Sequence, residues 1–195
     1  FFYRHNNYID PLDRAAEELA KSGGTRRSEV RRRLRTYLQT EHQVRVKTSN
    51  DEDFKDTYYF DEADRTLLLA ADLRPGQQAF QMATLLAFLE ADELIEQVLD
   101  ATTRELARIG LAHHFAGAFV LPYSPFFRAA ERLRYDVEQL AQYFGVGYET
   151  VAHRLSTLQR QNLRGVPFIF VRVDRAGNIS KRQSATGFHF SRSGG

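Results

Sequence analysis

The sequence of 195 residues predicts an α+β fold with a mainly helical body, a small β-sheet and a C-terminal β-hairpin. Three observations predict this fold. Apolar residues recur at helical spacing through most of residues 10–160, strand-like segments interrupt them between residues 43 and 70, and the period changes to that of strands after residue 165. A content of 43% hydrophobic and 27% charged residues fits an ordinary globular protein.

The first two elements are predicted to be helices. Residues 10–22 favour a helix because Asp10 is a good N-cap and Pro11 fits the first helical position, and two glycines follow. The next helix has Thr25 or Ser28 as its candidate cap. Its apolar positions, at helical spacing, are Val30, Leu34, Tyr37 and Leu38.

Strands and then long helices follow. Residues 43–48 alternate between the two faces of a strand, and TYYF-DEAD-RTLLLA (residues 57–70) predicts a β-hairpin with a polar turn. After Arg74-Pro75-Gly76, one helix is predicted from about residue 77 to residue 99. Thr102 or Thr103 caps another, which extends to about Val120.

The last third of the chain changes from helices to strands. Ser124-Pro125 predicts the start of a helix, and residues 136–160 predict two short helices around Gly145-Val146-Gly147. PFIFVRVD, a turn at residues 175–178 and ISKRQSATGFHF predict a closing hairpin. We therefore divide the chain into a helical domain, residues 1–165, and a β-hairpin segment, residues 166–195, that closes the same domain.

Composition excludes several classes of site. Without cysteine the chain has no disulfide, no thiol nucleophile and no thiolate metal site. No apolar run approaches the ~20 residues that cross a bilayer, and the first ten residues do not resemble a secretory signal. We expect a cytoplasmic protein that does not contact membranes.

The net charge of +2 is unevenly distributed. Residues 1–47 carry +5, residues 48–105 carry −10 and residues 106–195 carry +7. The basic flanks would attract phosphate groups. Alternatively, the oppositely charged segments simply attract one another when the chain folds.

The helix around residues 79–97 invites comparison with the H-E-x-x-H helix of zinc proteases. Such a site needs two histidines one turn apart and a glutamate base. Thr84, Leu85 and Phe88 occupy the comparable positions here, and none of them replaces those groups. His113 and His114 are adjacent, so on a helix they diverge by about 100° and do not easily share one metal. The sequence therefore predicts no metal site and no catalytic residues.

Phenylalanines offer a possible apolar pocket. Phe80, Phe88, Phe115 and Phe119 lie on the two central helices and would line such a pocket, although core packing is the commoner fate of such residues.

Residues 136–160 also have the sequence shape of a helix-turn-helix. If this segment bound DNA, Tyr148, Glu149, Thr150 and Arg154 would face base edges. The alternative is an αα-hairpin inside a larger fold. A DNA-binding module in this segment therefore remains an alternative function.

Separate cations are candidates for phosphate binding. Arg27 lies near a helix start, where free amides also favour phosphate, Lys55 precedes Tyr58-Tyr59, and Arg182 lies on the closing hairpin. An adenine would need an aromatic plate beside such cations. Solvated surface charge is the alternative for each of them.

Four segments carry a resemblance to a known family: FQMATLLAFLEADELI, LARIGLAHHFAGAFVLPYSPF, LRYDVEQLAQYFGVGYETVAHRLSTLQR and RGVPFIFVRVDRAGNISKRQSATGFHF. The chain resembles the short-chain fatty-acyl transcriptional regulators, and most of all the actinobacterial regulators of propionate catabolism and the glyoxylate bypass. The resemblance implies a scaffold similar to that of the ImmA/IrrE zinc peptidases, with Thr84, Leu85 and Phe88 at the positions of the first histidine, the glutamate and the second histidine.

The resemblance implies a ligand-sensing domain that binds a short-chain acyl-CoA, such as propionyl-CoA, and needs no cofactor. Family members contact promoter DNA through an N-terminal helix-turn-helix that is absent here, and some hold an iron–sulfur cluster in a cysteine-bearing segment after this one. The related peptidases contain the hairpin of residues 136–160 within their own fold, which weakens the DNA-binding alternative. Regulators of palindromic operators are usually dimers, so we expect a homodimer.

The expected ligand site combines both lines of reasoning. We expect the acyl end near Thr84, Phe88 and Phe115, with Tyr123 at the mouth of the pocket. Arg27, Lys55 and Arg182 are the expected phosphate ligands and Tyr59 the expected adenine plate, on residue type and predicted location alone. A metallohydrolase with an unfamiliar ligand set is the remaining rival, and stoichiometric zinc would support it.

Overall fold

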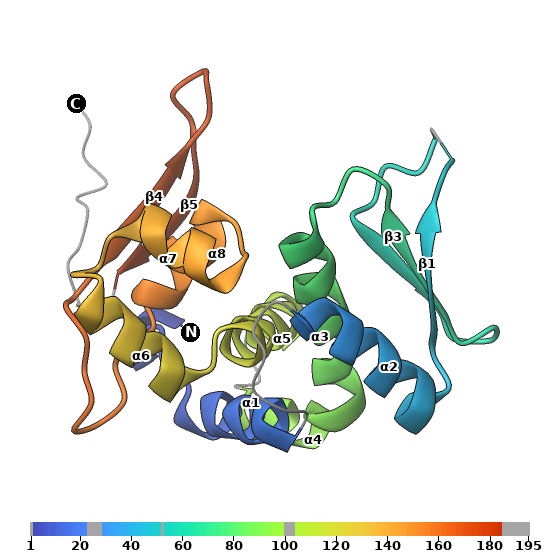
Figure 1. The fold of residues 1–195 in the computed structure, drawn as a ribbon, viewed down its shortest axis with the longest axis horizontal. Coiled ribbons are helices and arrows are strands. Elements are labelled where there is room, and N and C mark those ends of the chain that lie inside the picture. The colour runs from blue at the N-terminus through green and yellow to red at the C-terminus, as the bar shows by residue number, and fades with distance from the viewer. Residues whose placement is uncertain (1, 23–28, 52, 100–103, 185–195) are drawn as a thin grey trace.

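The computed structural model describes residues 2–22, 29–51, 53–99 and 104–184 (Figure 1). A helical body lies between two small β-sheets, one at each side of the view in Figure 1. The predicted α+β class, with a mainly helical body, is therefore confirmed. Among the described residues, none of the helices has the length and apolar character to span a membrane.

The chain begins with a single 3₁₀ turn and two helices, whose bounds are Phe2–His5, α1 Asp10–Ser22 and α2 Val30–His42. Both predicted helices are confirmed, and Leu34 and Leu38 are buried as expected. The N-cap prediction for Asp10 is wrong. Asp10 is the first helical residue, and its carboxylate accepts hydrogen bonds from Tyr8 and Arg14. The alternative caps of α2, Thr25 and Ser28, lie outside the described residues.

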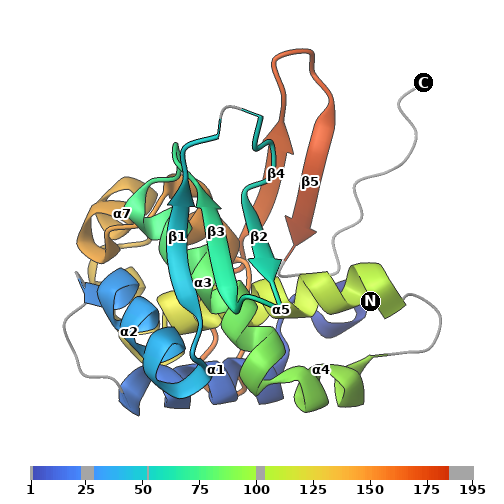
Figure 2. The ribbon, with the colours of Figure 1, turned by 90° about the vertical axis from the view of Figure 1, so that its right-hand side faces the viewer.

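The first sheet contains β1 Arg45–Ser49, β2 Tyr58–Asp61 and β3 Thr66–Ala70 in the order β1-β3-β2. The predicted hairpin of β2 and β3 is confirmed as an antiparallel pair, and β1 runs parallel to β3. Leu67 and Leu69 on the central strand are almost fully buried. Figure 2 shows α3 behind this sheet, whose other face is open to solvent.

One long helix was predicted for residues 77–99, but the structure contains α3 Pro75–Glu90 and α4 Asp92–Val98. The helix breaks at Ala91, whose φ of −123° and ψ of 14° leave the helical range. The break turns the chain so that Ile95 on α4 becomes fully buried. Pro75 occupies the first turn of α3, where its missing N–H costs nothing.

Helix α5, Arg104–Val120, forms the centre of the body and contacts α1, α3, α4 and α8. Ala112, Ala116 and Ala118 have no exposed surface, and their small side chains let the neighbouring helices approach this one closely. The candidate caps Thr102 and Thr103 lie outside the described residues.

The next three helices are α6 Tyr123–Arg132, α7 Val137–Phe144 and α8 Tyr148–Leu155. Helix α6 begins slightly before the predicted Ser124-Pro125, after Pro122. The two short helices are confirmed. Asp136 caps α7 by accepting a hydrogen bond from Gln139, and Gly145, with a φ of 67°, ends it.

The predicted closing hairpin is confirmed as β4 Ile169–Val173 and β5 Ile179–Ser184. These strands form a separate antiparallel sheet of two strands. Contacts join it to the helices: Phe168 stacks on Tyr135 with ring centroids 5.6 Å apart, and Arg172 pairs with Glu149 on α8.

Candidate functional site

The part of α3 that corresponds to a zinc-protease helix is packed into the core. Thr84 is fully buried, and its hydroxyl donates a hydrogen bond of 3.0 Å to the backbone oxygen of Phe80. Leu85 is 4% exposed. The ring of Phe88 is half-buried and lies 5.0 Å from the guanidinium of Arg108. These side chains offer neither a metal ligand nor a general base.

Two histidines on the neighbouring helix have separate environments. His114 is buried, and its Nε2 accepts a weak hydrogen bond of 3.4 Å from the backbone of Ile9. Burial lowers its pKa to about 4, so the ring is neutral near pH 7. His113 packs on Phe80 instead. Within the described residues, no three or more His, Asp or Glu side chains gather as metal ligands would.

A cavity of about 280 Å³ lies between α1, α2 and α5. Its apolar wall contains Leu19 from α1, Leu34 from α2 and Phe119 from α5. Arg32 and Arg33 of α2 also line it. The remaining lining residues, all on α2, are Thr36, Tyr37 and Thr40.

Arg33 is held in place by the end of α1. Its Nη2 donates a hydrogen bond of 2.8 Å to the backbone oxygen of Ala20, and burial lowers its pKa. Arg32 pairs with Glu29 at 2.8 Å and is more exposed. The cavity thus combines an apolar wall with two cationic side chains, which suits a ligand with an apolar part and an anionic part.

A second cavity, of about 490 Å³, lies between α1, α4 and α5. Its apolar lining includes Leu19, Leu94 and Phe115, and its polar lining includes three glutamates. The complete lining is Ala15, Glu18, Leu19, Glu90, Ala91, Glu93, Leu94, Gln97 and Phe115.

The two cavities are neighbours. Leu19 lines both, and the rings of Phe115 and Phe119, one from each cavity, stack with centroids 6.4 Å apart. Tyr37 of the first cavity donates a hydrogen bond of 2.8 Å to Glu90 of the second. Burial and this carboxylate raise the pKa of Tyr37 to about 12, so its hydroxyl remains a donor. Together the cavities reach the size of a typical small-molecule site, ~300–1,000 Å³.

The predicted acyl-site residues are only partly brought together. Phe115 lines the second cavity, whereas Thr84 and Phe88 line neither cavity. Tyr123 was expected at the mouth of a pocket, but it is fully buried. Its hydroxyl donates to the backbone oxygen of Leu163 and accepts from the backbone N–H of Arg160, so it is committed to internal bonds.

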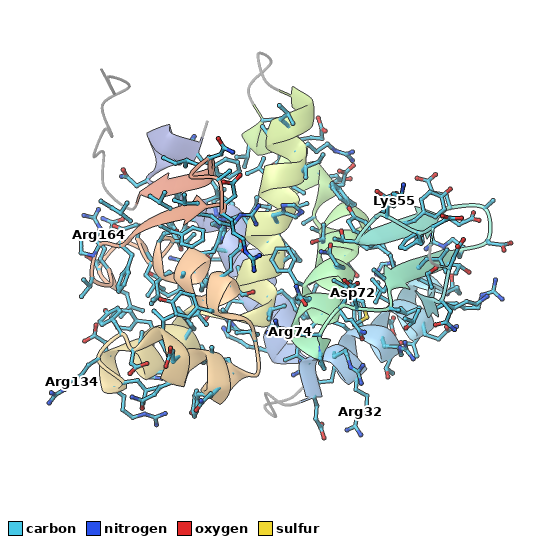
Figure 3. All side chains as sticks on the ribbon, turned by 90° about the horizontal axis from the view of Figure 1, so that it is seen from above. Arg32, Lys55, Asp72, Arg74, Arg134 and Arg164 are labelled. Carbon is cyan, nitrogen blue, oxygen red and sulfur yellow. The ribbon has the colours of Figure 1, made fainter. Side chains whose placement is uncertain are left out.

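The predicted phosphate and adenine ligands are scattered. Lys55 is exposed beside the three-stranded sheet (Figure 3). Tyr59 is 52% exposed on β2, and neither residue lines either of the two cavities described above. Arg27 lies outside the described residues, as does the side chain of Arg182 on β5.

Arg32 and Arg33 of α2 were not among the expected phosphate ligands, whereas Arg27, which was, lies outside the described residues. Arg33 and Tyr37 lie four residues apart, so they stack along the side of α2 next to Leu34. A helical projection places Arg33 at the border of the apolar face, whereas Arg32 lies about 100° farther from it. That border position is the signal that was missed.

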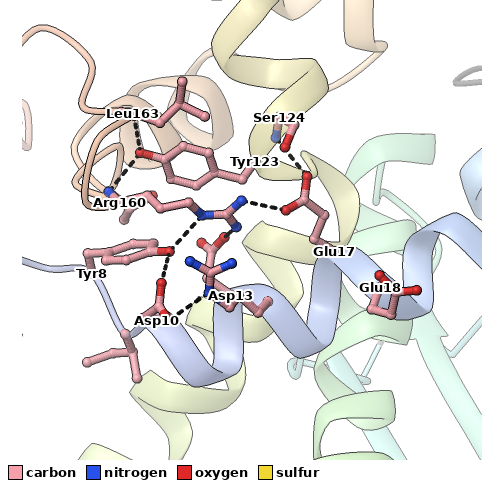
Figure 4. Close-up of polar contacts among 12 residues, drawn as sticks. Tyr8, Asp10, Asp13, Glu17, Glu18, Tyr123, Ser124, Arg160 and Leu163 are labelled. Carbon is pink, nitrogen blue, oxygen red and sulfur yellow. Dashed lines mark hydrogen bonds and ion pairs between the residues drawn. The ribbon is translucent and has the colours of Figure 1, made fainter.

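A buried cluster of charges connects α1 to the C-terminal helices (Figure 4). Asp13 accepts hydrogen bonds of 2.5 and 3.2 Å from Arg154 and of 3.0 Å from Arg160. Glu17 accepts a hydrogen bond of 2.7 Å from Arg160. It accepts another, of 2.8 Å, from the backbone N–H of Ser124 in the first turn of α6. The guanidinium of Arg160 also lies 4.1 Å from the ring centroid of Tyr123.

The cluster is balanced in charge, with two carboxylates and two guanidiniums. Burial alone would raise the pKa of Glu17, but hydrogen bonds from Ser124 and Arg160 lower it to about 2. Burial raises the pKa of Tyr123 to about 12. Glu17 and Tyr123 therefore keep one charge state across physiological pH, which suits a structural role.

The same cluster corrects the expected DNA contacts. Arg154 is 1% exposed and bound to Asp13, so it does not face a base edge. Of the other expected readers on α8, Tyr148 is 58% exposed, whereas Glu149 is exposed but pairs with Arg172. The hairpin of α7 and α8 packs into the larger fold.

Comparison with known proteins agrees with this geometry. Residues 39–156 match the family model of the IrrE N-terminal-like domain (Peptidase_M78). Residues 157–195 match that of the short-chain fatty acyl coenzyme A regulator, C-terminal.

Curated relatives match the whole chain. They include the HTH-type transcriptional regulators RamB (50% identical) and PrpR (51%) of Mycobacterium tuberculosis, and the propionyl-CoA carboxylase regulator of Cereibacter sphaeroides (43%). The chain covers only 41–42% of these relatives' own lengths.

A solved structure is also similar. The structure of a Mycobacterium tuberculosis transcriptional regulator superposes with a TM-score of 0.92 at 49% identity, over 100% of this chain and 61% of that one. Through the match to its central 118 residues, the chain belongs to the IrrE N-terminal-like domain family, on the branch of the short-chain fatty acyl coenzyme A regulators.

Proposed function

We propose that this chain is the effector-binding part of a bacterial transcription regulator and that its effector is a short-chain acyl-CoA such as propionyl-CoA. In this role it controls genes of short-chain fatty acid and propionate metabolism. The observation that carries the proposal is the cavity between α1, α2 and α5, where Arg32 and Arg33 border an apolar wall. An acyl-CoA has both parts that such a site fits, anionic phosphates and an apolar acyl-pantetheine arm.

The role is non-catalytic. Thr84, Leu85 and Phe88 stand where a peptidase of this fold would carry its metal ligands and base, and their side chains are packed or already hydrogen-bonded. The family match and the relatives' names support a regulator rather than a peptidase. DNA contact would come from a helix-turn-helix, since related regulators are named for that motif. The regulator would act as a homodimer, because regulators of palindromic operators are usually dimers.

Calorimetric titration of the chain with acetyl-, propionyl- and butyryl-CoA tests the proposal, with free CoA as the control. We expect acyl-CoA binding in the micromolar range. Differences between acyl lengths should be modest, because one methylene is worth ~1–3 kcal/mol in an apolar pocket. Affinities no tighter than millimolar for every acyl-CoA would contradict the proposal.

The location of the phosphates is tested by substitution. The double change Arg32→Ala and Arg33→Ala should weaken propionyl-CoA binding by about tenfold or more, since one hydrogen bond to a charged group contributes ~1.5–3 kcal/mol. Arg35→Ala is the matched control, because Arg35 is an exposed arginine of the same helix that does not line the cavity. Equal effects of the two changes would place the phosphates elsewhere.

A further inference from the structure

The two neighbouring cavities carry opposite charges. Arg32 and Arg33 line the first, whereas Glu18, Glu90 and Glu93 line the second, together with apolar side chains. Among the described residues that line the second cavity, there is no arginine, lysine or histidine. A ligand that spans both cavities therefore meets a cationic end and an anionic end.

The negative charge of the second cavity is only partly compensated. Glu18 pairs with Lys21 at 3.0 Å, but both side chains are more than 60% exposed, and such surface pairs contribute little. Glu90 accepts hydrogen bonds of 2.8 Å from Tyr37 and from His42 on the side of the first cavity. Glu93 is exposed at the rim.

Resting on the proposed function, we propose that the second cavity receives the acyl end of the effector and selects uncharged acyl groups against acyl groups that carry a second carboxylate. The phosphates of CoA lie beside Arg32 and Arg33 in this arrangement, and the acyl group reaches the apolar surface of Leu94 and Phe115. A carboxylate on the acyl group would meet the glutamates and be repelled.

Charge offers a sharper distinction here than size. Leu19, which lines both cavities, and Leu94 present apolar surface to the ligand. An acyl chain one methylene longer or shorter would fit this surface with little change in affinity. A like charge about 4 Å away costs roughly 1 kcal/mol even in water, which corresponds to about fivefold in affinity, and more where solvent is excluded. The sensor would thus respond to monocarboxylic acyl thioesters and ignore their carboxylated derivatives.

A matched pair of ligands isolates the effect of charge. Isobutyryl-CoA and methylmalonyl-CoA differ mainly by a methyl group in place of a carboxylate, so their acyl groups have similar size. We expect methylmalonyl-CoA to bind the chain at least about fivefold more weakly than isobutyryl-CoA at low salt. The difference between the two affinities should become smaller as the salt concentration is raised, because salt screens exposed charges.

Substitutions assign the effect to its residues. The double variant Glu18→Gln, Glu93→Gln should gain more affinity for methylmalonyl-CoA than for isobutyryl-CoA, so that the difference between the two affinities becomes smaller. Glu138→Gln, an exposed glutamate of α7 outside both cavities, is the control and should leave the gap as it is.

The outcomes separate this inference from the proposed function. If isobutyryl- and methylmalonyl-CoA bind equally well, or if the gap persists in the double variant, the selectivity inference is wrong while acyl-CoA sensing stands. If propionyl-CoA, isobutyryl-CoA and methylmalonyl-CoA all fail to bind, the proposed function and the inference both fall.

Discussion

At the scale of single residues, Asp13 joins segments of the fold that lie far apart in the sequence. It has no exposed surface, and it accepts hydrogen bonds from both buried arginines of the cluster, Arg154 and Arg160. The aspartate comes from the first helix, and its partners lie more than 140 residues later in the chain. One carboxylate therefore joins the two ends of the fold.

Replacement of this carboxylate should be costly. Asp13→Asn keeps the shape but removes the charge, and leaves two buried guanidiniums with Glu17 as the main counter-charge. We expect the free energy of unfolding in urea to fall by ~3–5 kcal/mol. Asp10→Asn changes an exposed carboxylate that pairs with Arg14 and accepts a hydrogen bond from Tyr8, and it should cost much less than Asp13→Asn. Similar losses in the two variants would show that the cluster contributes little.

His114 predicts a pH dependence. Its folded-state pKa of about 4 lies below the ordinary 6.5, so the unfolded chain binds a proton more readily. The contribution of neutral His114 to the free energy of unfolding is complete above pH 6.5. It is lost as the pH falls from 6.5 to 4. The loss is on the order of 3 kcal/mol.

The measurement is the free energy of unfolding at several pH values between 7 and 4. His114→Gln should flatten the curve in this window, whatever its effect at pH 7. An unaltered slope in His114→Gln would contradict the assignment.

At the scale of secondary-structure elements, the start of α3 meets the turn between α7 and α8. A Cβ added at Gly76 would lie 2.9 Å from the backbone oxygen of Gly145 and 3.0 Å from the Cα of Val146. Both neighbours are backbone atoms, so they do not move aside easily. The helical hairpin can therefore pack against α3 only if residue 76 has no side chain.

Gly76→Ala should for this reason destabilise the fold by ~1–3 kcal/mol, although alanine is the better helix former. Gly117→Ala is the matched control, because its added Cβ would have no neighbour within 4 Å. That change within α5 should stabilise the fold by up to ~1 kcal/mol. Thermal unfolding of both variants should give shifts of opposite sign, and equal shifts would contradict the proposed contact.

At the scale of the whole molecule, α1 connects the two regions of interest. Asp13 and Glu17 face the buried cluster, whereas Ala15, Glu18 and Leu19 line the cavities. A ligand that displaced α1 would therefore act on the cluster that holds the C-terminal helices. Such a coupling requires that the ligand bind the two arrangements with unequal affinity.

Much of this fold could be predicted from local patterns. Every described α-helix except the separate α4 was expected near its observed place, because periodicity and helix-ending glycines act within a few residues. The failure at Ala91 has a tertiary cause, since no breaking residue marks it and the turn serves to bury Ile95.

The sequence by itself determined the α+β class, the strand pairing of both hairpins and the loss of metal-binding chemistry at Thr84, Leu85 and Phe88, since these depend on residue type and short-range spacing. Only the tertiary structure decided which charges are available. Arg154 became a buried partner of Asp13, and Arg33 came to border a cavity, because the environment of a side chain depends on segments far away in the chain. Burial, not composition, distinguished the structural arginine from the candidate ligand-binding one.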